Sequence, residues 1–274
     1  MTRRSARPGS SALVAGTARS IGRSARRTGL RLDQLLVERG CAASREQARR
    51  LIMSGAVRVD DRIIDKPGHR TAADAAVELS GAPKFVSRGG IKLEGALLAL
   101  GLPVAGRVAM DVGASTGGFT DCLLQHGARR VYAVDVGYGQ LAWSLRQDPR
   151  VVVIERTNIR TMSSAAVPER VDLVTADVSF ISLRLVLPAL RPWLAERADL
   201  LVLVKPQFEV GRGRVGRGGV VRDPALRDSA LRQVAAAAGE AGYRLSGETP
   251  SVLPGPKGNR ESFLWLQWGI ISAE

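Results

Sequence analysis

The hydrophobic residues that follow position 28 first keep the spacing of short helices. Leu32, Leu35 and Leu36 share one helical face, and Gly40 is a typical residue for the end of a helix. Ser44 has capping-box spacing to the glutamine three residues later, so we expect a second helix to begin there. The apolar side of this second helix, Ala48, Leu51 and Ile52, is opposite a basic side formed by Arg45, Arg49 and Arg50.

The spacing then changes to that of strands. Residues 57–59 and 62–64 read as two short strands around a tight turn at Asp60 and Asp61. From Gly106 onward, apolar runs of strand length alternate with helical segments, which is typical of a doubly wound parallel sheet. The candidate strands are residues 108–110, 131–134, 151–154, 171–174 and 200–204. The pattern predicts a Rossmann-like α/β domain at 87–274, preceded by a small α+β module at 29–81 and a junction at 82–86.

The charge of the chain points to a polyanionic partner. The net charge is +14 and the isoelectric point is about 11.1. Residues 1–28 hold seven arginines, no acidic residue and few large apolar residues, so we expect a disordered basic tail; a cleaved signal is the alternative.

Composition also limits the compartment and the chemistry. No apolar run approaches the roughly 20 residues that span a bilayer, so we expect a soluble, cytoplasmic protein without a membrane partner. Cys41 and Cys122 fit no metal-binding or disulfide pattern, so no metal site is expected.

A glycine-rich turn follows the first predicted strand of the larger domain. Its D-x-G-x-x-x-G-G spacing differs from the fingerprint that seats a pyrophosphate, which favours a nucleoside cofactor without phosphate; a plain strand-to-helix turn is the alternative. Asp135 ends the second strand, where a carboxylate can accept ribose hydroxyls, and Asn158 could face an adenine or simply form a turn. The candidate cofactor-binding residues are Asp111, Gly113, Ser115, Gly117, Gly118, Phe119, Asp135 and Asn158.

Two charged residues follow later strands. Asp177 follows the fourth strand and Lys205 the fifth, so both should reach the ligand crevice at the carboxyl edge of the sheet; a surface salt bridge is the alternative. Lys205 ends an unbroken apolar run, and desolvation favours the neutral amine that can accept a proton. The fourth strand is not followed by the Pro-Pro-aromatic turn of enzymes that methylate exocyclic amines. Neither cysteine lies where enzymes that methylate a pyrimidine carbon have their nucleophile. Methylation of an oxygen therefore remains.

The module at 29–81 resembles the RNA-binding domain named after ribosomal protein S4. The resemblance rests on the order helix, Ser-Arg-x-x-Ala-x-x-Leu-Ile helix and Gly-x-Val-x-Val strand. It implies contacts with RNA phosphates, which give affinity without choosing the nucleotide. The candidate RNA-binding residues here are Arg45, Arg49, Arg50 and Arg58.

Residues 29–268 as a whole resemble the TlyA family of rRNA cytidine 2′-O-methyltransferases, historically labelled haemolysins. The strongest stretches are residues 87–93, 113–120, 135–141, 204–210 and 253–256. The family's catalytic domain is of the FtsJ type, whose Lys-Asp-Lys-Glu tetrad falls on Lys92, Asp177, Lys205 and Glu261. The resemblance implies S-adenosylmethionine as cofactor and cytidines in the rRNA of assembled ribosomal subunits as substrates.

Some alternatives remain open at this point. Arg212 and Arg214 lie in a glycine-rich loop at 210–219, either on RNA phosphates or as a flexible solvated loop. A non-catalytic ribosome-assembly factor would have a vestigial cofactor site, against which the complete tetrad argues. A membrane-active haemolysin would need a spanning or lytic helix, and neither is apparent in the sequence.

Overall fold

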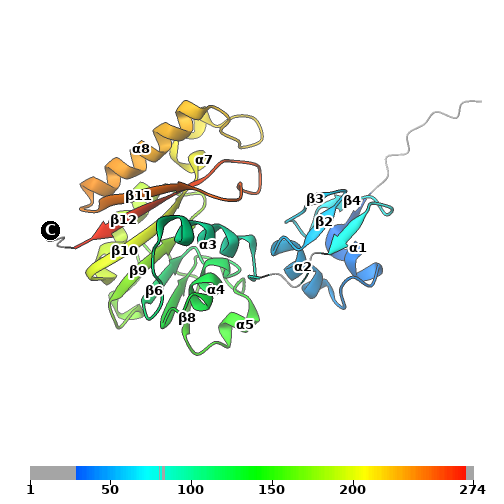
Figure 1. Cartoon of the computed structure of the whole chain (residues 1–274), viewed down its shortest axis with the longest axis horizontal. Helices are drawn as coiled ribbons and strands as arrows, with labels where there is room; N and C mark the ends of the chain where they lie inside the picture. The colour runs from blue at the N-terminus through cyan, green and yellow to red at the C-terminus, as the bar shows by residue number, and fades with distance from the viewer. Residues whose placement is uncertain (1–28, 80, 82–83, 270–274) are drawn as a thin grey trace, which may run out of the picture.

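The computed structural model describes residues 29–79, 81 and 84–269. Two bodies follow one another along the chain, a small front module and a larger α/β domain (Figure 1). The predicted basic tail at 1–28 lies outside the described residues, as do positions 82 and 83 of the predicted junction.

The front module has the helices and the hairpin that the pattern predicts. Its helices are α1 (Leu32–Glu38) and α2 (Arg45–Met53), and its strands are β1 (Leu30–Arg31), β2 (Val57–Val59), β3 (Arg62–Ile63), β4 (Arg70–Thr71) and β5 (Val77–Leu79). Ser44 caps α2, its hydroxyl accepting the backbone N–H of Gln47 at 3.1 Å. Asp60 and Asp61 have φ of 47° and 64°, the left-handed pair that a two-residue hairpin turn requires. Apolar side chains of both helices and of β2 form its core.

The larger domain is built on one seven-stranded sheet in the order β11-β12-β10-β9-β6-β7-β8. The five predicted strands are β6 (Val108–Val112), β7 (Arg130–Val134), β8 (Val151–Ile154), β9 (Val171–Ala176) and β10 (Leu194–Val204), and they are parallel to one another. Two further strands were not predicted from the sequence, β11 (Arg244–Pro250) and β12 (Ser262–Trp268). β12 inserts between β10 and β11, antiparallel to both.

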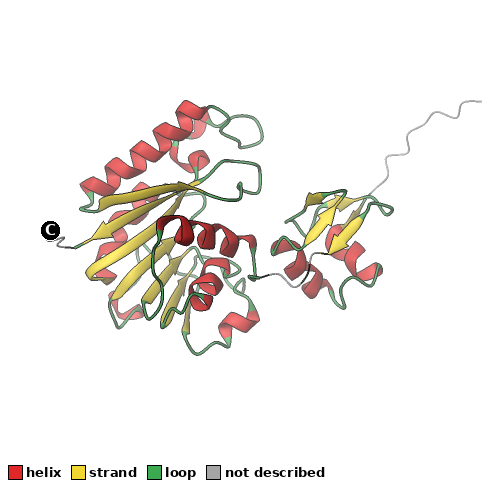
Figure 2. Cartoon of the chain, viewed as in Figure 1, coloured by secondary structure: helices red, strands yellow, loops and turns green. Residues whose placement is uncertain are grey.

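Helices cover both faces of this sheet (Figure 2). On one face, α3 (Arg88–Leu100) and α4 (Gly118–Gln125) pack on alternate strand residues such as Ala109 and Leu201. On the other face, α6 (Leu183–Leu190) and α8 (Pro224–Glu240) pack on the intervening residues such as Met110 and Val202. The short helices α5 (Trp143–Arg146) and α7 (Pro206–Glu209) lie beyond strand ends. This two-core arrangement leaves the carboxyl ends of the parallel strands free to hold a site.

Candidate active site

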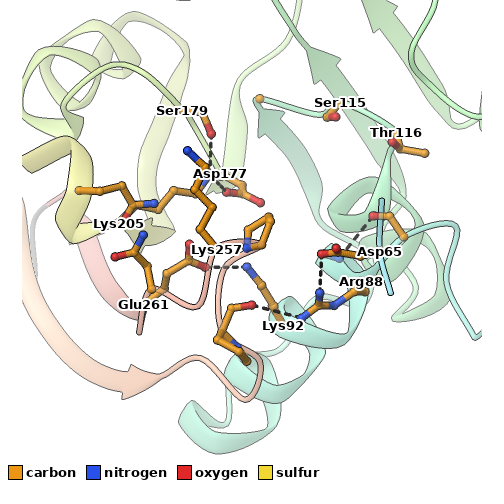
Figure 3. Close-up of a pocket in the computed structure, with 18 of the residues that line it drawn as sticks. Asp65, Arg88, Lys92, Ser115, Thr116, Asp177, Ser179, Lys205, Lys257 and Glu261 are labelled. Atoms are coloured by element: carbon orange, nitrogen blue, oxygen red, sulfur yellow. Dashed lines mark hydrogen bonds and ion pairs between the residues drawn. The ribbon is translucent and has the colours of Figure 1, made fainter. Parts of the chain in front are cut away.

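A cavity of about 540 Å³ opens at the carboxyl ends of β6, β9 and β10. Its wall includes Lys92, Asp177, Lys205 and Glu261, the four residues that the tetrad pattern singles out. They come from four separate segments of the larger domain (Figure 3). Residues of the front module complete one side of the wall, namely Met53, Asp65 and Lys66.

Lys205 and Asp177 form the first of two ion pairs in this cavity. Lys205 Nζ lies 2.5 Å from Asp177 Oδ1 and donates to Ser179 Oγ at 2.9 Å. Both residues directly follow their strands, and β9 and β10 are neighbours in the sheet. A lysine ammonium has three N–H donors, so one position on Nζ remains after these two contacts.

Lys92 and Glu261 form the second pair, and it is buried. Lys92 Nζ donates to Glu261 Oε2 at 2.5 Å, and the two side chains are 9% and 1% exposed. Lys92 lies in the second turn of α3, while Glu261 directly precedes β12. The second oxygen, Glu261 Oε1, is buried without a hydrogen-bond partner among the described residues. A buried carboxylate oxygen of this kind is a binding position for a donor from a ligand or water.

The glycine-rich turn forms another part of the cavity wall. Gly113 has a φ of +86°, and a Cβ at this position would lie 2.7 Å from the carbonyl oxygen of Asp177, so a side chain is excluded. Gly118 and Phe119, at the start of α4, line the cavity together with Ser115 and Thr116. Gly117 has a φ of +98° as the residue before α4. The predicted turn therefore brings its backbone to the cavity.

Asp135 lies beside this turn. Its Oδ2 accepts the backbone N–H of Ser115 at 2.7 Å, and its Oδ1 accepts that of Gly137 at 2.6 Å. These bonds fix the carboxylate next to the turn and leave some of its lone pairs free. A contact with ribose hydroxyls stays a prediction.

Four of the predicted cofactor residues do not line the cavity, namely Asp111, Gly117, Asp135 and Asn158. Asp111 is fully buried, where Oδ2 accepts the hydroxyl of Thr120 at 2.7 Å and Oδ1 accepts that of Thr175 at 3.2 Å. Burial raises the pKa of Asp111 to about 7. Asn158 Oδ1 accepts the backbone N–H of Arg160 at 3.1 Å, which is the turn alternative. The predicted contact of Asp111 with the cofactor is therefore wrong, because its buried carboxylate instead bonds to Thr120 and Thr175. A contact of Asn158 with an adenine stays a prediction.

The arginines predicted to bind RNA have an organising residue that the sequence analysis missed. Asp33 is buried in the front module, and its carboxylate accepts from Arg31 at 3.0 Å and from Arg45 at 3.0 Å, with Arg49 Nε 3.8 Å away. The hydrogen bond from Arg31, followed by that from Arg45, lowers the pKa of Asp33 to about 2 against the effect of burial. Arg45 and Arg49 remain 54% and 56% exposed.

The other predicted RNA contacts are dispersed. Arg50 pairs with Glu46 at 3.8 Å, and Arg58 donates to the carbonyl of Asp61 at 3.0 Å. Arg214 is exposed, whereas the side chain of Arg212 lies outside the described residues. The structure brings Arg45 and Arg49 together and does not bring Arg50 or Arg58 onto the same carboxylate.

Two aromatic residues at the cavity also escaped the sequence analysis. Phe180 is exposed, has a φ of 65°, and lies 5.2 Å from the ring of Phe208, measured between centroids. Both residues line the cavity. An exposed ring held in this way offers a face on which a planar group can stack. The unusual φ had no signal in the sequence.

Neither a membrane span nor a metal cluster occurs in the part of the chain that the structure describes. Within it, no helix is long and apolar enough to cross a bilayer. Within the same residues, no three or more His, Cys, Asp or Glu side chains gather as metal ligands.

Comparison with known families matches both parts of the chain. Residues 85–268 match the FtsJ-like methyltransferase family, and residues 30–73 match the S4 domain. The solved structure of a hemolysin from Streptococcus thermophilus superposes with a TM-score of 0.70 at 41% identity, covering 89% of this chain and 90% of that one.

Two relatives extend the match to named proteins. The 16S/23S rRNA (cytidine-2'-O)-methyltransferase TlyA of Mycobacterium tuberculosis (strain ATCC 25618 / H37Rv) is 54% identical over 239 residues, which cover 86% of this chain and 89% of that protein. Hemolysin A of Brachyspira hyodysenteriae is 38% identical, covering 85% of this chain and 97% of that protein. With an FtsJ-like domain, an S4 domain and relatives at this level of identity, the chain belongs to the TlyA family of FtsJ-like methyltransferases.

Proposed function

We propose that this methyltransferase transfers the methyl group of S-adenosylmethionine to the 2′-hydroxyl of cytidine in the ribosomal RNA of assembled ribosomal subunits. The observation that carries the proposal is the meeting of two lysine–carboxylate pairs in one cavity beside the glycine turn. The name of the Mycobacterium tuberculosis relative, a 16S/23S rRNA (cytidine-2'-O)-methyltransferase, supports the choice of cytidine and of rRNA.

The cavity fits the cofactor. Gly113, Ser115, Gly118 and Phe119 bring backbone and an apolar ring to one part of the wall, which a nucleoside can contact. Asp135 does not itself line the cavity, but it accepts the backbone N–H of Ser115, which does, and in the proposal its carboxylate accepts ribose hydroxyls. When bound, S-adenosylmethionine supplies a methyl group on a sulfonium that an oxygen nucleophile can attack.

Lys205 is the group that accepts the proton of the hydroxyl. In transfer, the bond from the 2′-oxygen to the methyl carbon forms as the carbon–sulfur bond breaks, and the hydroxyl proton moves to a neutral Nζ. Asp177 and Ser179 fix Nζ on two sides, and Lys205 lines the cavity in which the substrate hydroxyl would lie. The proton that Lys205 takes from the hydroxyl then passes to solvent, which restores the neutral amine.

Lys92 and Glu261 act as an orienting pair. A buried ion pair holds its geometry because separating the charges would leave one of them uncompensated. The pair keeps the substrate oxygen in line with the methyl group. Such fixed alignment of reacting atoms lowers the activation free energy by several kcal/mol.

The front module delivers the RNA. Three guanidinium groups surround Asp33, so the cluster keeps a net positive charge that phosphates can neutralise. Contacts of this kind fix register on the RNA and leave the choice of nucleotide to the cavity. The target cytidine must leave its stack to reach the Lys205 amine.

The experiment that tests the proposal uses purified small and large subunits that lack the modification. Incubation with methyl-labelled S-adenosylmethionine, followed by nuclease digestion and mass spectrometry, should yield 2′-O-methylcytidine. Label on a base, label on another nucleoside, or no transfer to either subunit would contradict it.

The cofactor site has its own test in Asp135→Asn. The amide keeps one acceptor oxygen but loses the charge. Affinity for S-adenosylmethionine should therefore fall by about tenfold, which is the usual contribution of one charge-assisted hydrogen bond. Calorimetric titration measures it. Unchanged affinity would remove Asp135 from the cofactor site.

A further inference from the structure

Arg88 joins the two parts of the molecule at the rim of the cavity. Its Nη1 donates to Asp65 Oδ2 of the front module at 2.5 Å, and its Nη2 donates to the carbonyl of Pro254 at 3.2 Å (Figure 3). Arg88 and Asp65 are 19% and 20% exposed, so solvent screens the pair less than a surface pair. The stem of Arg88 also packs on the front module, since a Cβ at Gly55 would lie 3.0 Å from its Cγ.

The loop that accepts the second of these bonds lies directly against Glu261. A Cβ at Gly255, the residue after Pro254, would lie 2.4 Å from Glu261 Oε1. The loop is closed by the backbone bond from Gly255 N–H to the carbonyl of Asn259 at 2.9 Å. The side chain of Asn259 in turn accepts the N–H of Val221 at 2.9 Å. The position of this loop therefore sets the position of the Glu261 carboxylate.

The same arginine lies on the helix that carries the partner of Glu261. Arg88 is the first residue of α3 and Lys92 is four residues later, so the two side chains lie one turn apart on one side of the helix. Arg88, the loop, Glu261 and Lys92 thus form a closed set of contacts, and Asp65 attaches the front module to it.

We propose that Arg88 is a positioning residue for methyl transfer, which holds Glu261 and Lys92 in place only when the front module is docked through Asp65. The inference rests on the proposed function, because the rate that it changes is methyl transfer. Arginine suits the task because its planar fork reaches two acceptors that lie in different directions, whereas a lysine ammonium is a single point. The front module then acts in the chemical step as well as in RNA binding.

A direct contact between Arg88 and an RNA phosphate is the competing role. Two of its nitrogens already bind protein acceptors, and most of the side chain is covered. A phosphate contact would change the KM for subunits and leave kcat unchanged, since it would act equally in the ground and transition states. A positioning residue changes kcat.

The test compares Arg88→Gln, Asp65→Asn and the double variant, measuring kcat and KM for subunits at saturating S-adenosylmethionine. We expect each single change to lower kcat by about tenfold. The kcat of the double variant should be no more than about twofold below that of the slower single variant, because all three variants lose the same contact between residues 88 and 65. Arg88→Lys should lie between wild type and Arg88→Gln. Affinity for S-adenosylmethionine should stay within about twofold of wild type, since no cofactor-binding residue is touched.

Matched controls lie on the β2–β3 hairpin of the front module, a few residues before Asp65. Asp61→Asn and Arg62→Gln make the same chemical changes at exposed positions and should keep kcat within about twofold, as surface substitutions usually do. A kcat of Arg88→Gln equal to wild type, a change in KM alone, or independent effects of the two single changes would overturn the proposal.

Small-angle scattering of the full chain separates this inference from the proposed function. Arg88→Gln and Asp65→Asn should broaden the distribution of distances between the two bodies, and Asp61→Asn should not. If wild type methylates no subunit, the proposed function fails, and an unchanged scattering profile of Arg88→Gln would independently overturn the contact.

Discussion

The front module and the cavity each surround a buried carboxylate with basic side chains, but they do so differently. In the cavity, Glu261 has one ion-pair partner among the described residues, Lys92, and both side chains are buried. In the front module, Asp33 has several arginine partners, and those on α2 are more than half exposed. Each of the four tetrad residues is paired with an opposite charge, whereas the positive charge around Asp33 remains in excess.

The difference separates the two tasks of the molecule. Balanced, desolvated charges have fixed geometry, which chemistry at a single atom requires. A surplus of exposed guanidinium groups on one buried anchor offers long-range attraction to phosphates and tolerates variation in the ligand. Changes in the cavity should therefore act on rate or folding, and changes around Asp33 on affinity.

The largest effect is expected at Lys205. Lys205→Ala removes the proton acceptor, so kcat should fall by about 10²–10⁴-fold, the usual contribution of a general base. Calorimetric affinity for S-adenosylmethionine is the control and should not change, because the residue acts on the hydroxyl. A variant that keeps most of its activity would remove Lys205 from the mechanism.

The buried pair should dominate stability. Lys92→Met or Glu261→Gln leaves one group without its partner, and we expect a loss of about 3–5 kcal/mol in the free energy of unfolding. Urea denaturation measures this loss. The double variant Lys92→Met/Glu261→Gln should lose less than the sum of the two single changes, and full additivity would show that the two side chains do not interact.

A smaller effect is expected on the exposed arginines. The double variant Arg45→Gln/Arg49→Gln removes two phosphate contacts, so affinity for subunits should fall by about tenfold or more. The slope of log affinity against log salt concentration should become shallower by about two. Glutamine is chosen because a glutamate would also repel Asp33. Arg62→Gln is the matched exposed control, and an equal loss there would mean that net charge alone matters.

The smallest effect concerns pH and stability. Burial raises the pKa of Asp111 to about 7 from the ordinary 3.8, so between these values the folded state holds a proton that the unfolded state has lost. Folding stability should therefore fall as pH rises through this window. In Asp111→Asn the fall in melting temperature between pH 5 and pH 8 should shrink by about 5–10 °C, because about two pH units of titration correspond to about 2.7 kcal/mol and each kcal/mol to about 2–4 °C. The exposed control Asp61→Asn should keep the wild-type slope.

The sequence could predict what depends on local pattern. The spacing around Ser44 and the Asp60-Asp61 turn predicted an α2 cap and a hairpin that the structure confirms. The tetrad motif predicted four residues that the structure brings to one cavity. In each case neighbours in sequence, or a family motif, carried the information.

The contacts that escaped prediction join distant segments. Arg88 lies 166 residues before Pro254, and no local pattern links them. Asp111 was misjudged for a related reason: its place at the end of a strand is visible in sequence, but which way the side chain points is not. Thr120 and Thr175, its hydroxyl partners, come from two other elements.

The ladder between β10 and β12 pairs Val204 with Ser262, so Lys205 and Glu261 are the next residues on each side. Insertion or deletion of one residue inside β12 would turn its side chains to the opposite face. The glycine-rich loop at 210–219 lies outside this ladder, although its residues Val215 and Gly219 line the cavity. Because every change of length inside β12 alters the register, length polymorphism among natural variants of this gene should be absent from β12.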